Sequence, residues 1–500
     1  MKFRISGLAA AVALAIIAGI LAPAVTGAVP APVATGPTAS VIVRTAPGGD
    51  AGVEAFVARS GGRITDRVAM IGALVCELPA DRVAALQALP GVVRVTADAT
   101  CSEAGSRDYT WTPDSDSTAA ASPTNVYLET ARVRPVWRLE RDGRSVNGRD
   151  VAIAVIDSGV TDGADFRWDD YRSGTTCIDV SVNLATGETG TADGNGHGTH
   201  VAGLIAGDGS ASRAGYSGVA PGSNLVNLKV SGADAQATEA DVLRALQWVY
   251  DNHETYNVRV VNLSLNSDVA QSYKESPIDA ACEILWFNGI VVVASAGNSG
   301  PNGVTLNAAP ANDPFVITVG ASDEAYTSSR GDDRVATFSA YGTTTDGFTK
   351  PDVYAPGRNI FSTLSPDSLW AEEYPERVDS TGKYFRMSGT SVSAPIVSGT
   401  VALMLQYEPS LTPDQVKNRL VRSASTIYDP AGARRPYLDA YSAVTSSDTR
   451  SANTGTAAST LLTTGEESIL TSSAMWNSVM WNSVMWNSGE TLSCQSVMWH

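Results

Sequence analysis

Short apolar runs separated by turn residues recur between Val126 and about Val444. Among them are VAIAVID, LVNLKV, VRVVNLS, IVVVASA and FVITVG, which are apolar at almost every position. Strands with this composition are typical of a parallel sheet that is covered by helices on both faces. The region therefore predicts an α/β domain of three layers, with a mostly parallel central sheet.

One helix between these strands is signalled clearly. Thr238 and Asp241 have the spacing of a capping box, in which the two residues satisfy each other's backbone amides at the start of a helix. Apolar residues then recur at helical spacing, at Val242, Ala245, Leu246 and Val249. The pattern predicts an amphipathic helix that begins after Thr238.

A smaller unit precedes this domain. From Val41 to about Thr96 the pattern predicts the order β-α-β-β-α-β, with the first helix near residues 53–58. Asp81 is expected to cap the second helix, and Pro90-Gly91 to end it before the last strand. The order predicts a small α+β unit.

The N-terminus has the pattern of a secretory signal peptide. Lys2 and Arg4 precede an apolar stretch, and small residues follow it. A membrane anchor is the alternative, because the stretch is just long enough to span a bilayer. We prefer export and cleavage, which predicts a secreted, extracellular protein.

Two further segments lack the pattern of a packed domain. The stretch from Cys101 to Asn125 is rich in Ser, Thr, Asp, Ala and Pro, which predicts a flexible linker that contains the processing site. Near the C-terminus, MWNSV recurs at Met475 and Met480, and MWNSG at Met485, a five-residue period that fits neither helix nor strand. We expect five segments, with bounds 1–28, 39–99, 100–125, 126–446 and 447–500.

Composition narrows the function. The 500 residues carry a formal net charge of −17, which argues against a nucleic-acid partner because phosphate binding needs clustered Lys and Arg. The five cysteines are too scattered for a disulfide framework or a CxxC zinc site. Cys177 and Cys282 either pair or remain free, buried thiols.

Three blocks contain the parts of a serine nucleophile system, which needs a hydroxyl, a base and a group that orients the base. Asp157 ends the strand VAIAVID, so its carboxylate is expected at the carboxyl edge of the sheet. His197 lies in DGNGHGTHVAGLIAG, and imidazole can accept and return a proton near neutral pH. Ser391 lies in MSGTSVSAP at the expected start of a helix, where free N–H groups favour negative charge. Pro395 falls in or near the first turn of that helix, where it is tolerated.

Two other residues need an interpretation. Asn298 in ASAGNSG follows a buried strand and can donate its amide N–H to an oxyanion, although in isolation it would be a turn former. The main alternative interpretation of the sequence around His197 is a metal site formed by His197 and His200. It lacks the HExxH spacing and a third nearby Cys or His, so His200 is expected to be a structural, hydrogen-bonded residue.

Together these blocks resemble the subtilisin family of serine proteases over residues 126–444. The similar motifs are AVIDSGV, GHGTHVAG, VVNLSL, ASAGNSG, KPDVYAPG and SGTSVSAP. The order Asp, His, Ser is also the order of that family. The resemblance implies a three-layer subtilisin-like fold with the catalytic triad Asp157, His197 and Ser391, and with Asn298 in the oxyanion hole.

The resemblance also implies how substrate binds. Residues 230–237 and 263–267 would flank an extended peptide as edge strands. The substrate-binding residues are then Ser264, Leu265, Asn266, Ser295, Ala296 and Gly297, the last three in the P1 pocket. This chain has Asn266 and Ser267 where many relatives have glycines, which is expected to narrow the pocket. Ala235 and Ala237 replace glycines on the other strand.

The unit at 39–99 resembles the ferredoxin-like α+β propeptide that inhibits such proteases. We therefore expect a secreted serine endopeptidase, monomeric and autoprocessed, with polypeptide substrates and its own propeptide as an intramolecular inhibitor. No cofactor is required. Calcium is common in the family, but no DxDxDG loop is present and no site is located. The alternative is a catalytically silent, cell-surface binding protein that displays the Trp-rich tail.

Overall fold

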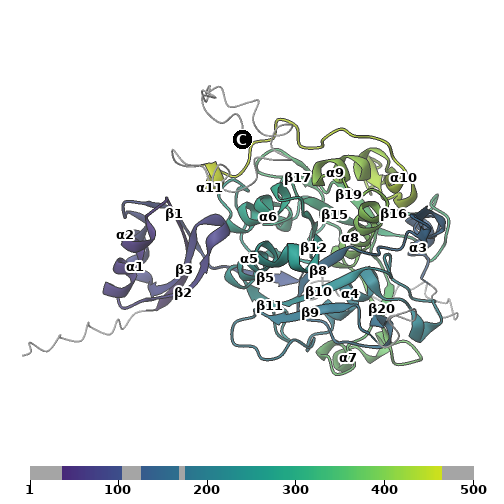
Figure 1. The fold of residues 1–500 in the computed structure, drawn as a ribbon, viewed down its shortest axis with the longest axis horizontal. Coiled ribbons are helices and arrows are strands. Elements are labelled where there is room, and N and C mark those ends of the chain that lie inside the picture. The colour runs from purple at the N-terminus through teal and green to yellow at the C-terminus, as the bar shows by residue number, and fades with distance from the viewer. Residues whose placement is uncertain (1–36, 104–124, 168–174, 464–500) are drawn as a thin grey trace, which may run out of the picture.

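The computed structural model describes residues 37–103, 125–167 and 175–463 (Figure 1). The predicted signal peptide, most of the predicted linker and the MWNSV repeats lie outside these residues. Figure 1 shows a small unit, residues 37–103, beside a larger body, residues 125–463. We call them the N-terminal unit and, because it contains the predicted triad residues, the catalytic unit.

The N-terminal unit has the predicted order β-α-β-β-α-β. Its antiparallel sheet has the strand order β2-β3-β1-β4. The prediction for Asp81 was wrong, because this residue lies inside a 3-10 turn, Ala80–Arg82, and caps no helix. The elements are β1 (Thr38–Thr45), α1 (Asp50–Arg59), β2 (Arg63–Val68), a 3-10 turn (Ala69–Ile71), β3 (Ala73–Pro79), α2 (Val83–Gln87) and β4 (Val92–Ala97).

A ten-stranded sheet forms the centre of the catalytic unit, in the order β16-β22-β23-β19-β15-β14-β12-β8-β10-β9. The run from β19 to β9 is parallel throughout, as the apolar runs predicted. Its strands are β8 (Ala152–Asp157), β9 (Ile178–Asn183), β10 (Asn224–Lys229), β12 (Val258–Leu263), β14 (Val291–Ser295), β15 (Ile317–Asp323) and β19 (Val353–Pro356), with β16 (Arg334–Val335), β22 (Ser425–Tyr428) and β23 (Arg434–Tyr437) at one edge.

Helices cover both faces of this sheet, which confirms the three-layer prediction. On the side of the N-terminal unit lie α5 (Glu239–Tyr256) and α6 (Pro277–Phe287), packed together (Figure 1). On the other side, α4 (His197–Ala206) packs against α8 (Thr390–Tyr407). The capping box is present as predicted: Thr238 accepts from the Asp241 amide, and Asp241 accepts from the Thr238 amide.

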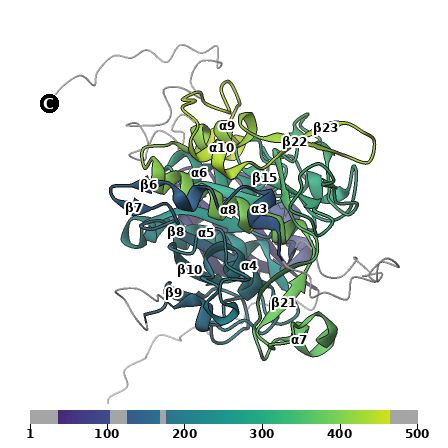
Figure 2. The same ribbon diagram turned by 90° about the vertical axis from the view of Figure 1, so that its right-hand side faces the viewer.

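Shorter elements complete the catalytic unit. Figure 2 shows α7 and β21 at one end of the molecule, on the side of α4. The remaining elements are α3 (Tyr127–Thr130), β6 (Glu140–Arg141), β7 (Arg144–Ser145), β17 (Gly342–Thr343), β18 (Thr349–Lys350), β20 (Ile360–Thr363), α7 (Leu369–Glu373), β21 (Tyr384–Met387), α9 (Pro413–Arg422), α10 (Ala440–Val444) and α11 (Thr460–Thr463).

A separate three-stranded sheet joins the two units. Its central strand, β5 (Thr100–Glu103), pairs antiparallel with β11 (Gln236–Thr238) on one side and with β13 (Leu265–Ser267) on the other. The sequence predicted a flexible linker from residue 100. Residues 100–103 instead form a strand because the catalytic unit offers two edges that satisfy their backbone groups.

The described cysteines Cys76, Cys101, Cys177 and Cys282 are free and buried. Cys177 precedes β9 at one edge of the central sheet, whereas Cys282 lies in α6, so the two are not paired. The second of the two predicted alternatives, the buried thiol, is therefore correct. Of the helices in the described ranges, none combines the length and the apolar composition that a membrane crossing requires.

Candidate active site

Asp157 and His197 form a buried pair at the carboxyl edge of the central sheet. Asp157 is the last residue of β8, and His197 is the first residue of α4. Asp157 Oδ1 lies 2.7 Å from Nδ1 of His197, and both side chains are at most 1% exposed. A carboxylate at this distance orients the imidazole and favours its protonated form.

Gly198 allows this close approach. A Cβ atom on Gly198 would lie 2.1 Å from the carbonyl oxygen of Gly159, in the loop after β8. Only a residue without a side chain lets α4 begin against that loop. A steric constraint therefore explains why a glycine follows the histidine in GHGTH.

Ser391 is the second residue of α8, whose N-terminus lies at the same edge of the sheet. Pro395 lies in the sixth position of the helix, further in than the sequence indicated, and it has no N–H to give to the carbonyl of Ser391. Ser264 supplies the missing donor, because its Oγ donates to that carbonyl at 3.0 Å. Ser264 thus fixes the turn of α8 that presents Ser391.

The two atoms between which a proton would move are buried and free. Among the described residues, neither Nε2 of His197 nor Oγ of Ser391 has a hydrogen-bond partner, and the structure does not join them to each other. Catalytic hydrogen bonds are often long before substrate binds. Neither atom is therefore used in a structural hydrogen bond to the described residues.

Asn298 lies beside the N-terminus of α8. Its Oδ1 accepts from the backbone amide of Thr390 at 2.9 Å and from Oγ1 of Thr390 at 3.1 Å. A backbone amide can only donate, so this contact fixes which end of the side chain is the oxygen. The side-chain NH₂ of Asn298 is left for another acceptor.

The predicted substrate-binding residues lie at the ends of neighbouring strands and are joined by hydrogen bonds. Leu265 and Asn266 belong to β13, and Nδ2 of Asn266 donates to the carbonyl of Ser295 at 3.1 Å. The amide of Gly297 donates to Oγ1 of Thr390, and Ala296 is fully buried. Asn266 therefore bridges β13 and β14, where a glycine would leave space.

Sequence reasoning missed Glu103, the last residue of β5. Its carboxyl group lies beside the Asp157–His197 pair, with Oε2 3.6 Å from Nδ1 of His197. Oγ of Ser231 donates to Oε1 at 3.3 Å. Glu103 comes from the predicted linker and Ser231 from the predicted substrate-flanking segment 230–237, and the pairing of β5 with β11 and β13 brings their side chains together.

Two more residues that the sequence did not single out surround the pair. Asp193 is 2% exposed and accepts from Oγ of Ser158 at 2.9 Å and from the amide of Thr199 at 2.8 Å. It thereby ties the loop after β8 to the start of α4. The ring of Trp370 packs edge-on against His197, with 5.7 Å between the ring centres. Asp193 lies in the quoted DGNGHGTH motif, which was the signal that could have found it.

Burial and neighbouring carboxylates set the protonation states. Burial opposes a charge on His197, but Asp157 and Glu103 outweigh it and raise the pKa of the imidazole to about 9. Burial also raises the pKa of the Glu103 carboxyl group, with Asp157 adding to the shift and His197 opposing it. The two shifts are linked, because Glu103 raises the pKa of His197 whereas His197 lowers the pKa of Glu103, and the imidazole must be neutral before it can act as a base.

His200 has the structural role that was predicted. Its Nε2 lies 3.1 Å from the carbonyl of Ile360, and burial lowers the pKa of the ring to about 3. Within the described ranges, one group of acidic and histidine atoms is close enough to hold a metal, namely Glu103, Asp157 and His197. In this structure Nδ1 of His197 and Oδ1 of Asp157 face each other at 2.7 Å as a hydrogen-bonded pair.

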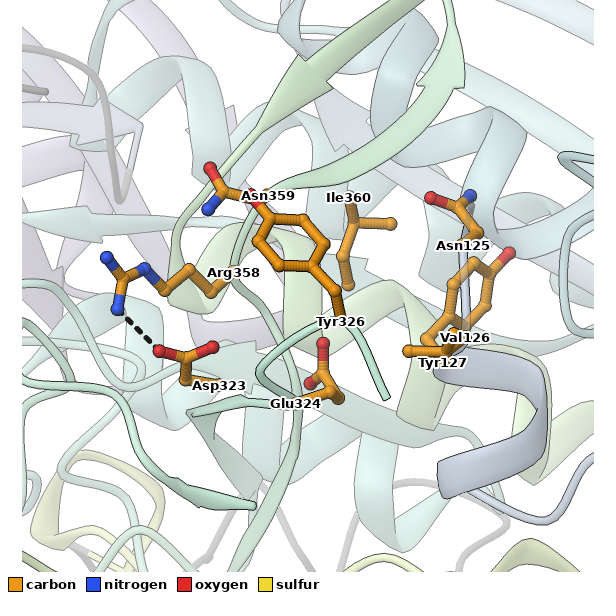
Figure 3. A pocket seen from close by; sticks show the side chains of 9 residues that line it. All are labelled: Asn125, Val126, Tyr127, Asp323, Glu324, Tyr326, Arg358, Asn359 and Ile360. Atoms are coloured by element: carbon orange, nitrogen blue, oxygen red, sulfur yellow. Dashed lines mark hydrogen bonds and ion pairs between the residues drawn. The ribbon is translucent and has the colours of Figure 1, made fainter. Parts of the chain in front are cut away.

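A surface pocket at another part of the catalytic unit contains none of these residues (Figure 3). Arg358 pairs with Asp323 at one side of it, and Asn125 lies at the other. Oε1 of the buried Glu324 accepts from Ser322 at 3.1 Å. None of the predicted catalytic or substrate-binding residues lines this pocket, so it is not the peptide site.

Comparison with known proteins decides the family. The model of the subtilase family matches residues 148–459, which is more than half of the chain. The chain belongs to the subtilase family. A model described as a putative peptidase inhibitor domain matches residues 20–98, which include most of the N-terminal unit. The chain is thus a subtilase whose N-terminal part matches a peptidase inhibitor domain.

Two named proteases, AprX and subtilisin BL, agree with this assignment. Serine protease AprX of Bacillus subtilis (strain 168) is 39% identical over 286 residues, a match that spans 56% of this subtilase and 62% of AprX. Subtilisin BL of Lederbergia lenta is 34% identical, over 57% of this chain and 87% of the relative. A crystal structure of a cold adapted subtilisin-like serine proteinase matches with 28% identity and a TM-score of 0.46, over 64% of this chain and 99% of the other.

Proposed function

We propose that this subtilase is a secreted, monomeric endopeptidase that cleaves polypeptides through an acyl-enzyme, with Asp157, His197 and Ser391 as its catalytic residues. The observation that supports this most is the buried Asp157–His197 contact of 2.7 Å together with the free Nε2 of His197 and the free Oγ of Ser391. All three side chains come from one chain, so a second copy is not needed to complete the site.

In this mechanism Nε2 of His197 takes the proton of Ser391 as Oγ attacks the scissile carbonyl carbon. Asp157 holds Nδ1 and stabilises the charged imidazole. The amide of Asn298 and the backbone N–H of Ser391 donate to the oxyanion. His197 then protonates the leaving amine, and water releases the acyl group from Ser391.

Autoprocessing is part of the proposal. In this structure β5 fills the groove between β11 and β13, as an extended substrate would. Residues 104–124, which follow β5, connect it to the catalytic unit, so cleavage there would leave β5 bound as a product-like inhibitor. The first reaction of the enzyme would then be on its own chain.

Ser391→Ala is the direct test. We expect hydrolysis of casein to fall by about six orders of magnitude and labelling by a fluorophosphonate to disappear. The melting temperature should stay the same, because Oγ of Ser391 makes no hydrogen bond to the described residues. The variant should also keep the peptide bonds of residues 104–124 intact, as mass spectrometry can show. Retained hydrolysis would contradict the proposed catalytic residue, and normal processing would contradict autoprocessing.

A further inference from the structure

The groove position occupied by Glu103 differs from its neighbours in β5. Cys101 is 1% exposed and belongs to the apolar core, whereas the hydroxyl of Ser102 lies at the surface and donates to Asp268 at 3.1 Å. The side chain of Glu103 is 2% exposed and yet polar. Of Cys101, Ser102 and Glu103, only Glu103 buries a polar side-chain group against the catalytic unit.

Ser231 is the residue that receives this head group. It lies two residues after β10, is 3% exposed, and donates its hydroxyl to Oε1 of Glu103 at 3.3 Å. Burying an acceptor without a donor costs free energy, so this contact offsets part of the cost of burying the carboxyl group, whose Oε2 has no hydrogen-bond partner among the described residues. Ser231 makes no other side-chain hydrogen bond that the structure records among the described residues.

We infer that Ser231 is a specificity-determining residue, and that its pocket selects substrates with glutamate or glutamine at the position that Glu103 occupies. This inference rests on the proposed function, because it takes β5 as the guide to how substrate lies. At this position the carboxyl group of Glu103 lies against the hydroxyl of Ser231 and the ring of His197. At this position the enzyme would therefore recognise a side chain whose acceptor oxygen lies as far from the backbone as in glutamate or glutamine.

The protonation state of Glu103 explains why both glutamate and glutamine are expected to fit at this position. Burial raises the pKa of the Glu103 carboxyl group, so the side chain binds as the neutral acid. Glutamine has the same length and offers the same acceptor oxygen to Ser231. Methionine has a similar length without an oxygen acceptor, and alanine leaves the hydroxyl of Ser231 without a partner.

The experiment uses the purified full-length chain after its activity on casein has become constant. Fluorogenic peptides copy residues 98–107, with alanine in place of the oxidisable Cys101 and with Glu, Gln, Met or Ala at the position of Glu103. We expect kcat/KM to be about tenfold higher for Gln than for Met, the ratio expected for one neutral hydrogen bond. Mass spectrometry of the products checks that all peptides are cut at the same bond.

Ser231→Ala should reduce the Gln-to-Met ratio to about one without abolishing cleavage of the Met peptide. Ser145→Ala, at an exposed serine in the β6–β7 hairpin, is the matched control and should keep the tenfold ratio. Replacing serine with methionine at the Ser102 position of the peptide should change kcat/KM little, because that side chain points to solvent.

The outcomes separate the two hypotheses. Casein hydrolysis with equal kcat/KM for the Gln and Met peptides would overturn the role of Ser231 and leave the proposed function standing. A tenfold ratio that survives Ser231→Ala would also overturn that role. If neither casein nor any peptide is cleaved, the proposed function fails, and the inference that rests on it fails as well.

Discussion

The central sheet and the sheet of the N-terminal unit differ in what covers their faces. The central sheet lies between two layers of helices from its own unit. The small sheet has its own helices α1 and α2 on one face only, where Val43, Val57 and Leu74 form a separate core. Its other face, with Ile42, Val68 and Val75, belongs to the core of the catalytic unit and packs toward α5 and α6.

This difference separates two kinds of contact. The helices of the catalytic unit cover its own sheet, whereas the contacts between the two units would be lost in the proposed release of the N-terminal unit. The catalytic unit could lose the N-terminal unit and keep both faces of its central sheet covered by helices. The contacts between the units also include polar ones near their edges, such as Arg244 with Asp66 and Arg94 with Glu275. We therefore expect changes inside the catalytic unit to be severe, and changes between the units to affect release of the N-terminal unit.

After Ser391→Ala, the largest effect is expected from Gly198→Ala. The new Cβ would meet the carbonyl oxygen of Gly159 at 2.1 Å, and a backbone atom in a packed site cannot move away cheaply. His197 would be displaced from Asp157, so kcat/KM on casein should fall by about a thousandfold or more. Peptidase assays and thermal melting measure the two consequences.

Gly194→Ala is the matched control for this substitution. It lies in the loop just before α4, but its Cβ would meet only Cβ of Ala233 at 3.5 Å and Cα of Ala233 at 3.9 Å, which are ordinary contact distances. Its activity should remain within a fewfold of the parent. Equal losses in the two variants would show that the approach of α4 to the loop is not the reason for the glycine.

A smaller effect is expected from pH on binding of the β5 segment. The pKa of Glu103 is raised from 4.5 to about 8 in the groove, by burial first and by Asp157 and Asp193 next, with His197 and Ser231 opposing the shift. Binding therefore takes up a proton. The affinity is full below pH 4.5, falls as the pH rises toward 8, and levels off above the raised pKa.

An amidated peptide that copies residues 98–104 can test this as a competitive inhibitor, beside the same peptide with Gln in place of Glu. His197 titrates in both complexes, and Glu103 is one of the groups that raise its pKa, so the ratio of the two inhibition constants reports the carboxyl group together with its effect on His197. Between pH 4.5 and 9 the Glu peptide should weaken relative to the Gln peptide by about two to three orders of magnitude. A constant ratio would mean that Glu103 is not bound as the neutral acid.

The sequence predicted the parts of the molecule that depend on local pattern. Apolar runs such as VAIAVID gave the parallel strands, and Thr238 with Asp241 gave the start of α5, because period and capping are properties of neighbouring residues. The motifs around Asp157, His197 and Ser391 gave the candidate site for a similar reason. Each is a short block at the end of one strand or the start of one helix.

The rest depends on pairings between distant segments. Thr100–Glu103 has no strand pattern of its own and becomes a strand only because β11 and β13 lie on both sides of it. The role inferred for Ser231 depends on its contact with Glu103, which lies 128 positions away in the sequence. Trp370 contacts His197 from the short helix α7, where no catalytic motif is present. No local pattern contains such information.

The smallest effect is expected from Arg44→Met, which tests whether the C-terminal segment helps to hold the N-terminal unit. Arg44 is 3% exposed; its Nε donates to the carbonyl of Leu461 at 3.0 Å, and its Nη1 donates to the carbonyl of Gly72 at 3.2 Å. Methionine keeps an apolar stem but loses these donors. We expect the N-terminal unit to leave about ten times faster, measured as a shorter lag before casein hydrolysis.

Arg63→Met is the control, because Arg63 is largely exposed and its ion pair with Glu77 lies within the N-terminal unit. Its lag should not change. Deleting residues 459–500 should also shorten the lag, since it removes the carbonyl of Leu461 and the buried side chains of Leu461 and Leu462. The deletion and Arg44→Met remove one shared hydrogen bond, so together they should speed release by less than the product of their separate effects. A fully multiplicative result would show that Arg44 holds the unit by contacts other than the one to Leu461.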